Sequence, residues 1–198
     1  MKIAIIGYSG HSYGVIESIL ELGYNVIGYF DKTHKNLLSK LEYLGRESHE
    51  TSGYNIFICI GDNVIRRNVY FKTKDLNNLD FYIKDPTSYV SVNSVVKHQT
   101  YVGKRAIINS NSIIGIGCII NTGSIIEHDC TIGDFTHIAP TATICGNVTI
   151  GNNCFVGANS TIIPGMKIGD NIIIGAGSVV NRNLESNCTY VGNPIRKL

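Results

Sequence analysis

Two histidines near the middle of the chain carry the side chains best suited to moving a proton. His128 stands between two carboxylates, Glu127 and Asp129, and His137 follows nine residues later. An imidazole can take up or release a proton near neutral pH, and an acid beside it can orient the ring. His128 is therefore a candidate general base. Adjacent residues on an extended chain point in opposite directions, so either acid could be the one that orients it.

The placement of these histidines depends on a repeat that occupies the second half of the chain. An Ile or Val recurs at every sixth residue, sixteen times without interruption, from Val90 to Val180. A small side chain stands four residues after most of them, and a Gly or Asn often stands one residue after them. A period of six fits neither an amphipathic helix nor an alternating strand, whereas hexapeptide repeats build a parallel β-helix. We expect each hexad to form a short strand and a corner where Gly or Asn is left-handed, with three hexads to a coil.

This repeat predicts where the two histidines lie. His128 comes two residues after Ile126, so we expect it at an exposed corner. His137 precedes Ile138, so we expect it to point outward from a flat face, where the outward Phe135 would suit a contact with another protein. The separation of nine positions between the histidines is half a coil, which puts them on opposite sides of one chain. They can share a site only where two chains meet.

Residues 1–84 have a different pattern, in which segments of strand length alternate with segments of helical spacing. We expect strands at 2–6, 25–30, 54–60 and 81–83, and helices at 12–22 and from about 64, whereas 32–52 has no clear pattern. This alternation indicates a small parallel sheet, and hence a Rossmann-like α/β domain. Asp85-Pro86 marks a boundary. The predicted fold is thus mixed, with the Rossmann-like domain at 1–84, the β-helix at 85–184 and a tail at 185–198.

A glycine-rich turn at residues 7–14 follows the first of these strands. Parallel sheets bind ligands beyond the carboxyl ends of their strands and at helix N-termini. Asp31 follows Gly7 by 24 residues, near the spacing at which an acid meets a ribose. Tight packing of strand against helix is the alternative explanation of the glycines. Because 84 residues lack the second half of a dinucleotide domain, we expect not a redox cofactor but a nucleotide-linked substrate, held by Gly7, Ser9, Gly10, His11, Asp31, Gly61, Asp62 and Asn63.

Composition excludes several classes of function. The net charge is +2 and there is no basic run, so nucleic-acid binding has no electrostatic support. The longest apolar stretches are too short to span a bilayer, and no signal peptide opens the chain. The six cysteines show no CxxC spacing, and three of them fill the small position of the repeat. We expect buried free thiols in a cytoplasmic protein.

Several motifs resemble those of the hexapeptide acyltransferases, and among them the sugar O-/N-acetyltransferases that include NeuD-type and PglD-type enzymes. The resemblance covers nearly the whole chain and rests on Ile5-Ile6-Gly7-Tyr8-Ser9-Gly10-His11, Ile60-Gly61-Asp62-Asn63 with Arg66-Arg67, residues 126–134, His137-Ile138-Ala139-Pro140 and the tail Val191-Gly192-Asn193-Pro194-Ile195-Arg196. It implies a left-handed β-helix, an uncommon hand for parallel connections. It also implies a homotrimer with acetyl-CoA between chains and a nucleotide sugar on the N-terminal sheet. The usual opening Gly-x-Gly-Gly-His-Gly is altered here at Ser9 and Ser12.

The resemblance also assigns roles to residues. It implies that His128 is the general base, oriented by Asp129 or Glu127, and that His137 of a neighbouring chain faces the acetyl group. The backbone N–H of Gly146 is expected at the acetyl oxygen. Pantetheine is expected along the small residues Ala158 and Ala176, and the CoA phosphates at Arg196 or Lys197. No metal is expected.

The acceptor stays open at this stage. We expect N-acetylation of a nucleotide-linked amino sugar, such as a 4-amino-4,6-dideoxy sugar for a bacterial surface glycan, by direct attack. O-acetylation of sialic acid or a related sugar is the alternative. A zinc site of the γ-type carbonic anhydrases, built from His98, His128 and His137, would leave the N-terminal domain unexplained. An inactive repeat scaffold would leave the C-terminal motif unexplained.

Overall fold

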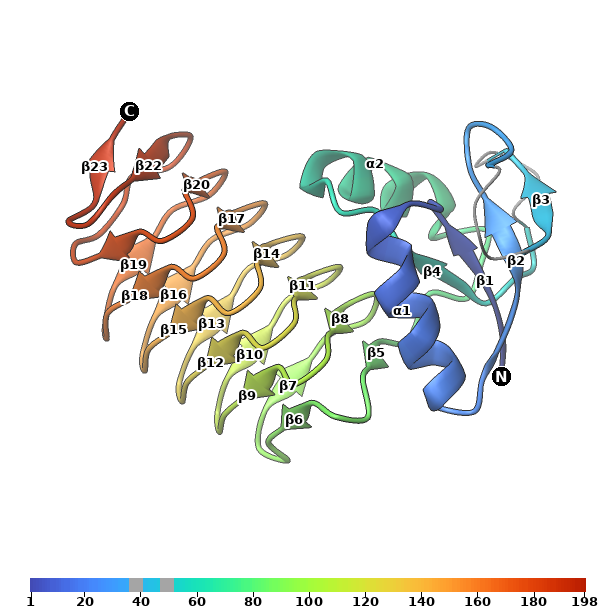
Figure 1. Cartoon of the computed structure of the whole chain (residues 1–198), viewed down its shortest axis with the longest axis horizontal. Coiled ribbons are helices and arrows are strands. Elements are labelled where there is room, and N and C mark those ends of the chain that lie inside the picture. The colour runs from blue at the N-terminus through green and yellow to red at the C-terminus, as the bar shows by residue number, and fades with distance from the viewer. Residues whose placement is uncertain (36–40, 47–51) are drawn as a thin grey trace.

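The computed structural model describes residues 1–35, 41–46 and 52–198. Its N-terminal part is a parallel four-stranded sheet in the order β3-β2-β1-β4, shown with its helices in Figure 1. The elements are β1 (Lys2–Ile6), α1 (Gly10–Glu21), β2 (Asn25–Phe30), β3 (Tyr43–Gly45), β4 (Ile56–Ile58) and α2 (Asn63–Thr73). The alternation of strands and helices predicted from the sequence is confirmed. The Rossmann-like sheet carries its glycine turn between β1 and α1.

The strand predicted at 81–83 does not belong to this sheet. The fourth strand is β3, which lies in the segment without a clear pattern. Instead β5 (Ile83–Lys84) pairs with β8 (Tyr101–Val102), and Ile83 donates its N–H to Thr100 O (3.0 Å). The prediction was wrong because a short apolar segment does not reveal which sheet completes its hydrogen bonds.

The remainder of the chain is the predicted parallel β-helix, whose strands pair in register with strands 18 residues away. The first face holds β6 (Tyr89–Val90), β9 (Ile107–Ile108), β12 (Ile125–Ile126), β15 (Thr143–Ile144), β18 (Thr161–Ile162) and β21 (Val179–Val180). The second face holds β7 (Val95–Val96), β10 (Ile113–Ile114), β13 (Thr131–Ile132), β16 (Thr149–Ile150) and β19 (Lys167–Ile168). The third face holds β5, β8, β11 (Ile119–Ile120), β14 (His137–Ile138), β17 (Phe155–Val156), β20 (Ile173–Ile174), β22 (Thr189–Val191) and β23 (Arg196–Lys197).

The repeated aliphatic residues fill the interior of this left-handed coil. From Val102 to Val180 each of them is at most 3% exposed, and the cysteines of the small position, Cys118, Cys130 and Cys154, are buried free thiols. Burial of this continuous column of apolar side chains is the main stabilising contribution to the coil.

The corners differ from the expectation in one respect. The residue with positive φ is not the Gly or Asn directly after the aliphatic residue but the one three positions after it, as in Asn111, Asp129 and Phe135. The glycines directly after the aliphatic residue instead allow successive coils to stack closely, because they have no side chain. A Cβ on Gly133, for example, would lie 2.5 Å from the backbone carbonyl carbon of Gly151 in the next coil.

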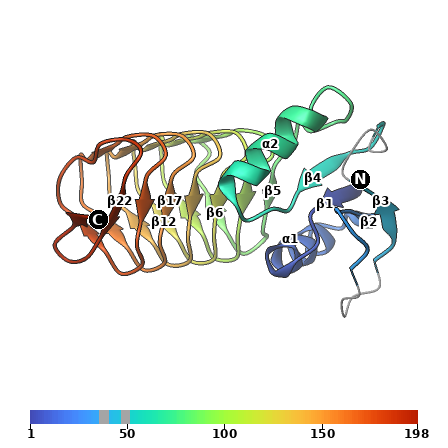
Figure 2. The same ribbon diagram turned by 90° about the horizontal axis from the view of Figure 1, so that it is seen from above.

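The N-terminal domain packs on the third face, at the end where the coils begin (Figure 2). Tyr101 and Ile119 of that face join the apolar cluster under α1. Phe135 packs against Tyr70 of α2, with ring centroids 5.4 Å apart, and is only 4% exposed. The expectation that Phe135 suits a contact with another protein is therefore wrong, because the N-terminal domain of the same chain covers it. In the described part of the chain, no helix has the length and apolarity to cross a membrane.

Candidate active site

His128 lies at the corner after β12, as predicted, and its side chain is 62% exposed. Its Nδ1 lies 2.7 Å from Oδ2 of Asp129. Asp129 has a φ of 60°, and this left-handed backbone turns its carboxylate back toward the ring. The bond also lowers the pKa of the Asp129 carboxyl. Occupation of Nδ1 leaves Nε2 as the atom that can meet a substrate.

Glu127 is engaged elsewhere. Its Oε2 accepts a hydrogen bond from Nδ2 of Asn109 (2.9 Å), one coil earlier. Of the two acids beside the imidazole, Asp129 is therefore the one that contacts it in this structure.

Gly146 lies one coil beyond His128, directly against its imidazole. A Cβ built on Gly146 would be 2.7 Å from both Cε1 and Nε2 of His128. The absence of a side chain at this position thus provides the space that the ring occupies. The structure brings His128, Asp129 and Gly146 together within one chain.

His137 points outward from the coil, as expected, but it is not on the surface. It is 9% exposed, because α1 and the segment 60–63 of its own chain cover β14. Its Nε2 lies 3.1 Å from Nδ2 of Asn121, and its ring centroid lies 6.4 Å from that of His11. Its Nδ1 is buried against the backbone of Gly61 and makes no hydrogen bond of good geometry to any described residue.

The imidazoles of His11 and His137 are both held neutral. Burial, and then the nearby Arg66 cation, lower the pKa of His11 to about 4. The same two causes in the same order lower the pKa of His137 to about 3, with a smaller effect from His11. Near neutral pH each ring therefore offers one N–H donor and one nitrogen acceptor. They line a hollow of about 360 Å³ together with Gly10, Gly14, Gly61, Tyr101, Asn121 and Thr122.

A second hollow, of about 420 Å³, lies at the carboxyl edge of the N-terminal sheet, where the sequence predicted the substrate. Of the predicted residues it is lined by Gly7, Ser9, His11, Asp31, Gly61 and Asp62. Gly7 has a φ of 89°, and a Cβ there would lie 2.6 Å from Ile60. The Asp31 carboxylate accepts the backbone N–H groups of Tyr8 (3.0 Å) and Lys32 (2.7 Å).

Two of the predicted substrate residues have structural partners. Asp62 is the N-cap of α2 and accepts from the N–H of Ile65 (2.8 Å). Asn63 donates to the carbonyl of Cys154 (2.8 Å), across the junction with the β-helix. At the altered opening motif, the Ser12 hydroxyl donates to Ser9 O (2.6 Å) and accepts from Ser9 N (3.1 Å).

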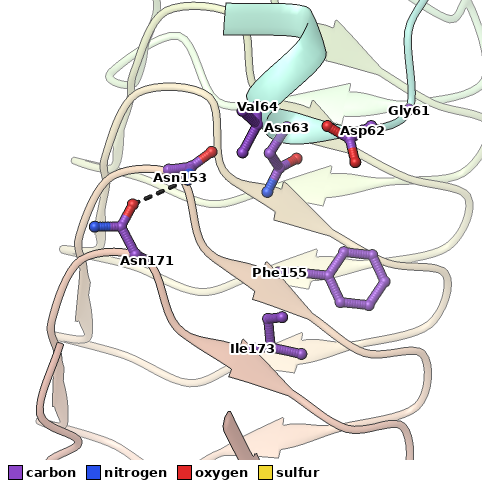
Figure 3. Close-up of a pocket in the computed structure, with 8 residues that line it drawn as sticks. All are labelled: Gly61, Asp62, Asn63, Val64, Asn153, Phe155, Asn171 and Ile173. Carbon is purple, nitrogen blue, oxygen red and sulfur yellow. Dashed lines mark hydrogen bonds between the residues drawn. The ribbon is translucent and has the colours of Figure 1, made fainter. Parts of the chain in front are cut away.

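A third hollow, of about 330 Å³, opens between the start of α2 and the third face (Figure 3). Phe155 and Ile173 form its apolar floor, and Asn153 donates to Asn171 (2.9 Å) at its edge. Gly61 lines this hollow as well as the two described above.

The residues expected to hold a cofactor lie at a different corner from His128. Gly177 donates its N–H to Ala158 O (2.9 Å), which stacks Ala158 beside Ala176 at the corner between the third and first faces. His128 and Gly146 occupy the corner between the first and second faces. Arg196 and Lys197 are exposed on β23, at the far end of the coil. One chain therefore does not bring these groups to His128. Within the described residues, no three His, Cys, Asp or Glu side chains cluster as metal ligands.

The sequence interpretation missed several residues of these hollows. Lys32 and Tyr8 line the second hollow, and Tyr101 and Asn121 line the first. The position of Lys32 directly after Asp31 was the sequence signal that could have placed it in the second hollow. Arg66 was noted only as part of a motif, yet among charged side chains it has the largest effect on the pKa of both buried imidazoles.

Comparisons with known proteins agree with this arrangement. The family described as PglD N-terminal domain matches residues 2–73, and the hexapeptide repeat of succinyl-transferase matches residues 147–182. No curated protein sequence matches the chain. The acetyltransferase domain of PglB from Neisseria gonorrhoeae is similar over 100% of this chain and 99% of its own, with 27% identity and a TM-score of 0.94. PerB from Caulobacter crescentus, solved with CoA and GDP-perosamine, is similar over 100% and 97%, with 31% identity and a TM-score of 0.93.

Proposed function

Because the chain belongs to the PglD-type sugar N-acetyltransferases, which use acetyl-CoA, we propose that it acetylates the amine of a nucleotide-linked 4-amino-4,6-dideoxy sugar. The Caulobacter relative is a perosamine N-acetyltransferase solved with CoA and GDP-perosamine. The observation that carries the proposal is the pairing of a glycine-turn hollow on the N-terminal sheet with the His128–Asp129 pair on the β-helix.

The geometry at His128 supports the following chemistry. The sugar amine attacks the thioester carbonyl carbon, the C–N bond forms and the C–S bond breaks. The amine must lose a proton, and Nε2 of His128 takes it while Asp129 holds Nδ1. The proton then passes to the departing CoA thiolate. In this proposal the Gly146 N–H donates to the carbonyl oxygen as negative charge develops there.

The substrate side is assigned to the first and second hollows. The nucleotide lies at the second hollow, where Lys32 provides a cation for the phosphates and Asp31 lies at the edge of the sheet. The sugar extends toward His11 and His137 in the adjoining hollow, since Gly61 and His11 line both. Neutral imidazoles suit this place because they can exchange hydrogen bonds with sugar hydroxyls without a charge.

A homotrimer completes this site. The Ala158 and Ala176 corner and the His128 corner are separate in one chain, so a neighbouring chain supplies the second corner. Acetyl-CoA then lies between two chains, with pantetheine along the alanines and the phosphates near Arg196 or Lys197. A monomer in light scattering with normal turnover would contradict this assembly.

An acceptor panel tests the function. Purified protein and acetyl-CoA are incubated with UDP-, dTDP- and GDP-linked 4-amino sugars and, separately, with sialic acid. Release of the CoA thiol with a gain of one acetyl group on the sugar amine, seen by mass spectrometry, supports the proposal. Acetylation of sialic acid alone would make the protein an O-acetyltransferase, and turnover of no acceptor would refute the proposal.

A further inference from the structure

Arg66 in α2 is buried, with 1% of its surface exposed, and uses every donor of its guanidinium group. An arginine side chain has five N–H groups. The five bonds are Nε to Gly117 O (2.7 Å), Nη1 to Ile60 O (2.9 Å) and Gly61 O (3.0 Å), and Nη2 to Asn63 Oδ1 (2.7 Å) and Phe135 O (2.9 Å).

These five acceptors belong to two parts of the molecule. The acceptors at 60, 61 and 63 form the segment that follows β4, whereas Gly117 and Phe135 are successive left-handed corners of the β-helix. The same short segment carries Gly61, which lines all three hollows. The guanidinium therefore ties the segment that lines the hollows directly to the backbone of the β-helix.

The charge of Arg66 has no carboxylate partner. Among the described residues, no Asp or Glu oxygen lies within 4.0 Å of the guanidinium. The guanidinium is surrounded instead by backbone carbonyl oxygens and by the side-chain amide oxygen of Asn63. Burial lowers the pKa of Arg66 to about 10, so it remains charged at neutral pH. Burial of this cation costs several kcal/mol, which its five hydrogen bonds offset, and removing the guanidinium would leave those buried acceptors without a donor. The charge of Arg66 nevertheless acts on both imidazoles, since it lowers the pKa of His11 and of His137.

We infer that Arg66 is a positioning residue for acetyl transfer, which holds the segment 60–63 against the β-helix so that the bound sugar lies at its place beside His137. This inference rests on the proposed function for its kinetic readout. It assigns no contact between Arg66 and substrate, because all five donors are already used. The sugar side of the reaction therefore depends on Arg66, and the acetyl-CoA side does not.

Two substitutions separate the parts of this role. Arg66→Lys retains the charge and loses the fork of donors, and Arg66→Met loses both. Misplacement of a bound group by about 1 Å can cost about 10²-fold, so kcat/KM for the nucleotide sugar should fall by about this factor in both variants. The KM for acetyl-CoA should stay at the wild-type value. Arg67→Met is the matched control, since Arg67 is exposed on the same helix and its guanidinium carbon lies 5.9 Å from the centroid of the Phe71 ring.

A second readout needs no turnover. The groups that face the two imidazoles are Arg66 from α2, Tyr101 from β8 and the rings themselves. In NMR titrations of the unliganded protein, the midpoints of His11 and His137 should move upward in Arg66→Met and stay lower in Arg66→Lys. Wild-type protein that acetylates no sugar would refute the proposed function but leave this readout intact.

Three results would overturn the inference. The first is a folded Arg66→Met protein with wild-type kcat/KM for the sugar. The second is an equal loss of sugar binding and acetyl-CoA binding in both variants, or a failure of both variants to fold. Either result would mean that Arg66 only stabilises the fold. The third is an unchanged titration of His11 and His137 in Arg66→Met.

Discussion

Gly146→Ala should slow catalysis without unfolding the protein. The backbone of Gly146 is not left-handed, so an Ala is not strained there. The three nearest atoms to the new methyl group all belong to the His128 ring, at 2.7, 2.7 and 3.3 Å. The backbone N–H of residue 146 is retained. The substitution therefore acts on one movable imidazole and on little else.

The size of the effect follows from these distances. To reach van der Waals contact, the ring must move by roughly 1 Å, and such a displacement of a reacting group costs about 10²-fold in rate. That loss corresponds to about 2.7 kcal/mol in the activation barrier. The unfolding free energy should change by less than about 1 kcal/mol, because replacing Gly by Ala without strain slightly favours the folded state.

Initial rates with the best acceptor and urea unfolding measure the two quantities. Gly133→Ala is the contrasting control, since its methyl group meets backbone in the next coil, and it should lose stability. In a His128→Ala protein the substitution Gly146→Ala should have no further effect, because the ring is gone. Wild-type kcat in Gly146→Ala, or the same loss in both backgrounds, would refute the role of this contact.

Three other outcomes follow from the structure. The folded pKa values of about 4 for His11 and about 3 for His137 lie below the ordinary 6.5, so the unfolded chain binds protons first and stability falls as pH drops below 6.5. By pH 5 each ring should lower the unfolding free energy by about 2 kcal/mol relative to neutral pH. Urea unfolding measures this, with a smaller loss expected in His11→Asn than in wild type. An unfolding free energy of the wild type that does not change between pH 6.5 and pH 5 would contradict the prediction. Asp31→Ala should weaken nucleotide-sugar binding about tenfold and spare acetyl-CoA in calorimetry, whereas binding of NAD would refute the substrate assignment. If His128→Ala and His137→Ala are each inactive, mixed trimers of the two should regain activity, and inactive mixed trimers would exclude a shared site.

Much of the architecture could be predicted because the repeat is a local pattern. An aliphatic residue at every sixth position has to face one interior, and this placed His128 at a corner and His137 on an outward strand position. The corner conformation could not be predicted in the same way. The left-handed residue stands three positions after the aliphatic one and includes Asp129 and Phe135, because the stacking of coils decides it rather than residue preference alone.

The rest of the site depends on contacts between distant segments. No pattern within the repeat shows that α1 and the segment 60–63 cover His137, and this burial is what makes its ring neutral. The choice between Asp129 and Glu127 depended on Asn109, which lies one coil earlier. Arg66 is a residue type that is seldom buried, so its sequence position gave no reason to place it at the junction of the domains.

The pairing of each residue with the one 18 positions later makes the chain sensitive to the length of any insertion. An insertion of six residues between His128 and Gly146 would turn everything downstream by one face of the prism. Another residue would then stand beneath the imidazole, and Ala158 and Ala176 would move to a different edge. An insertion of 18 residues would lengthen the stack and leave every downstream residue on its original face. Among descendants of this gene, selection should therefore tolerate whole added coils beyond the active residues far more readily than changes of one or two hexads.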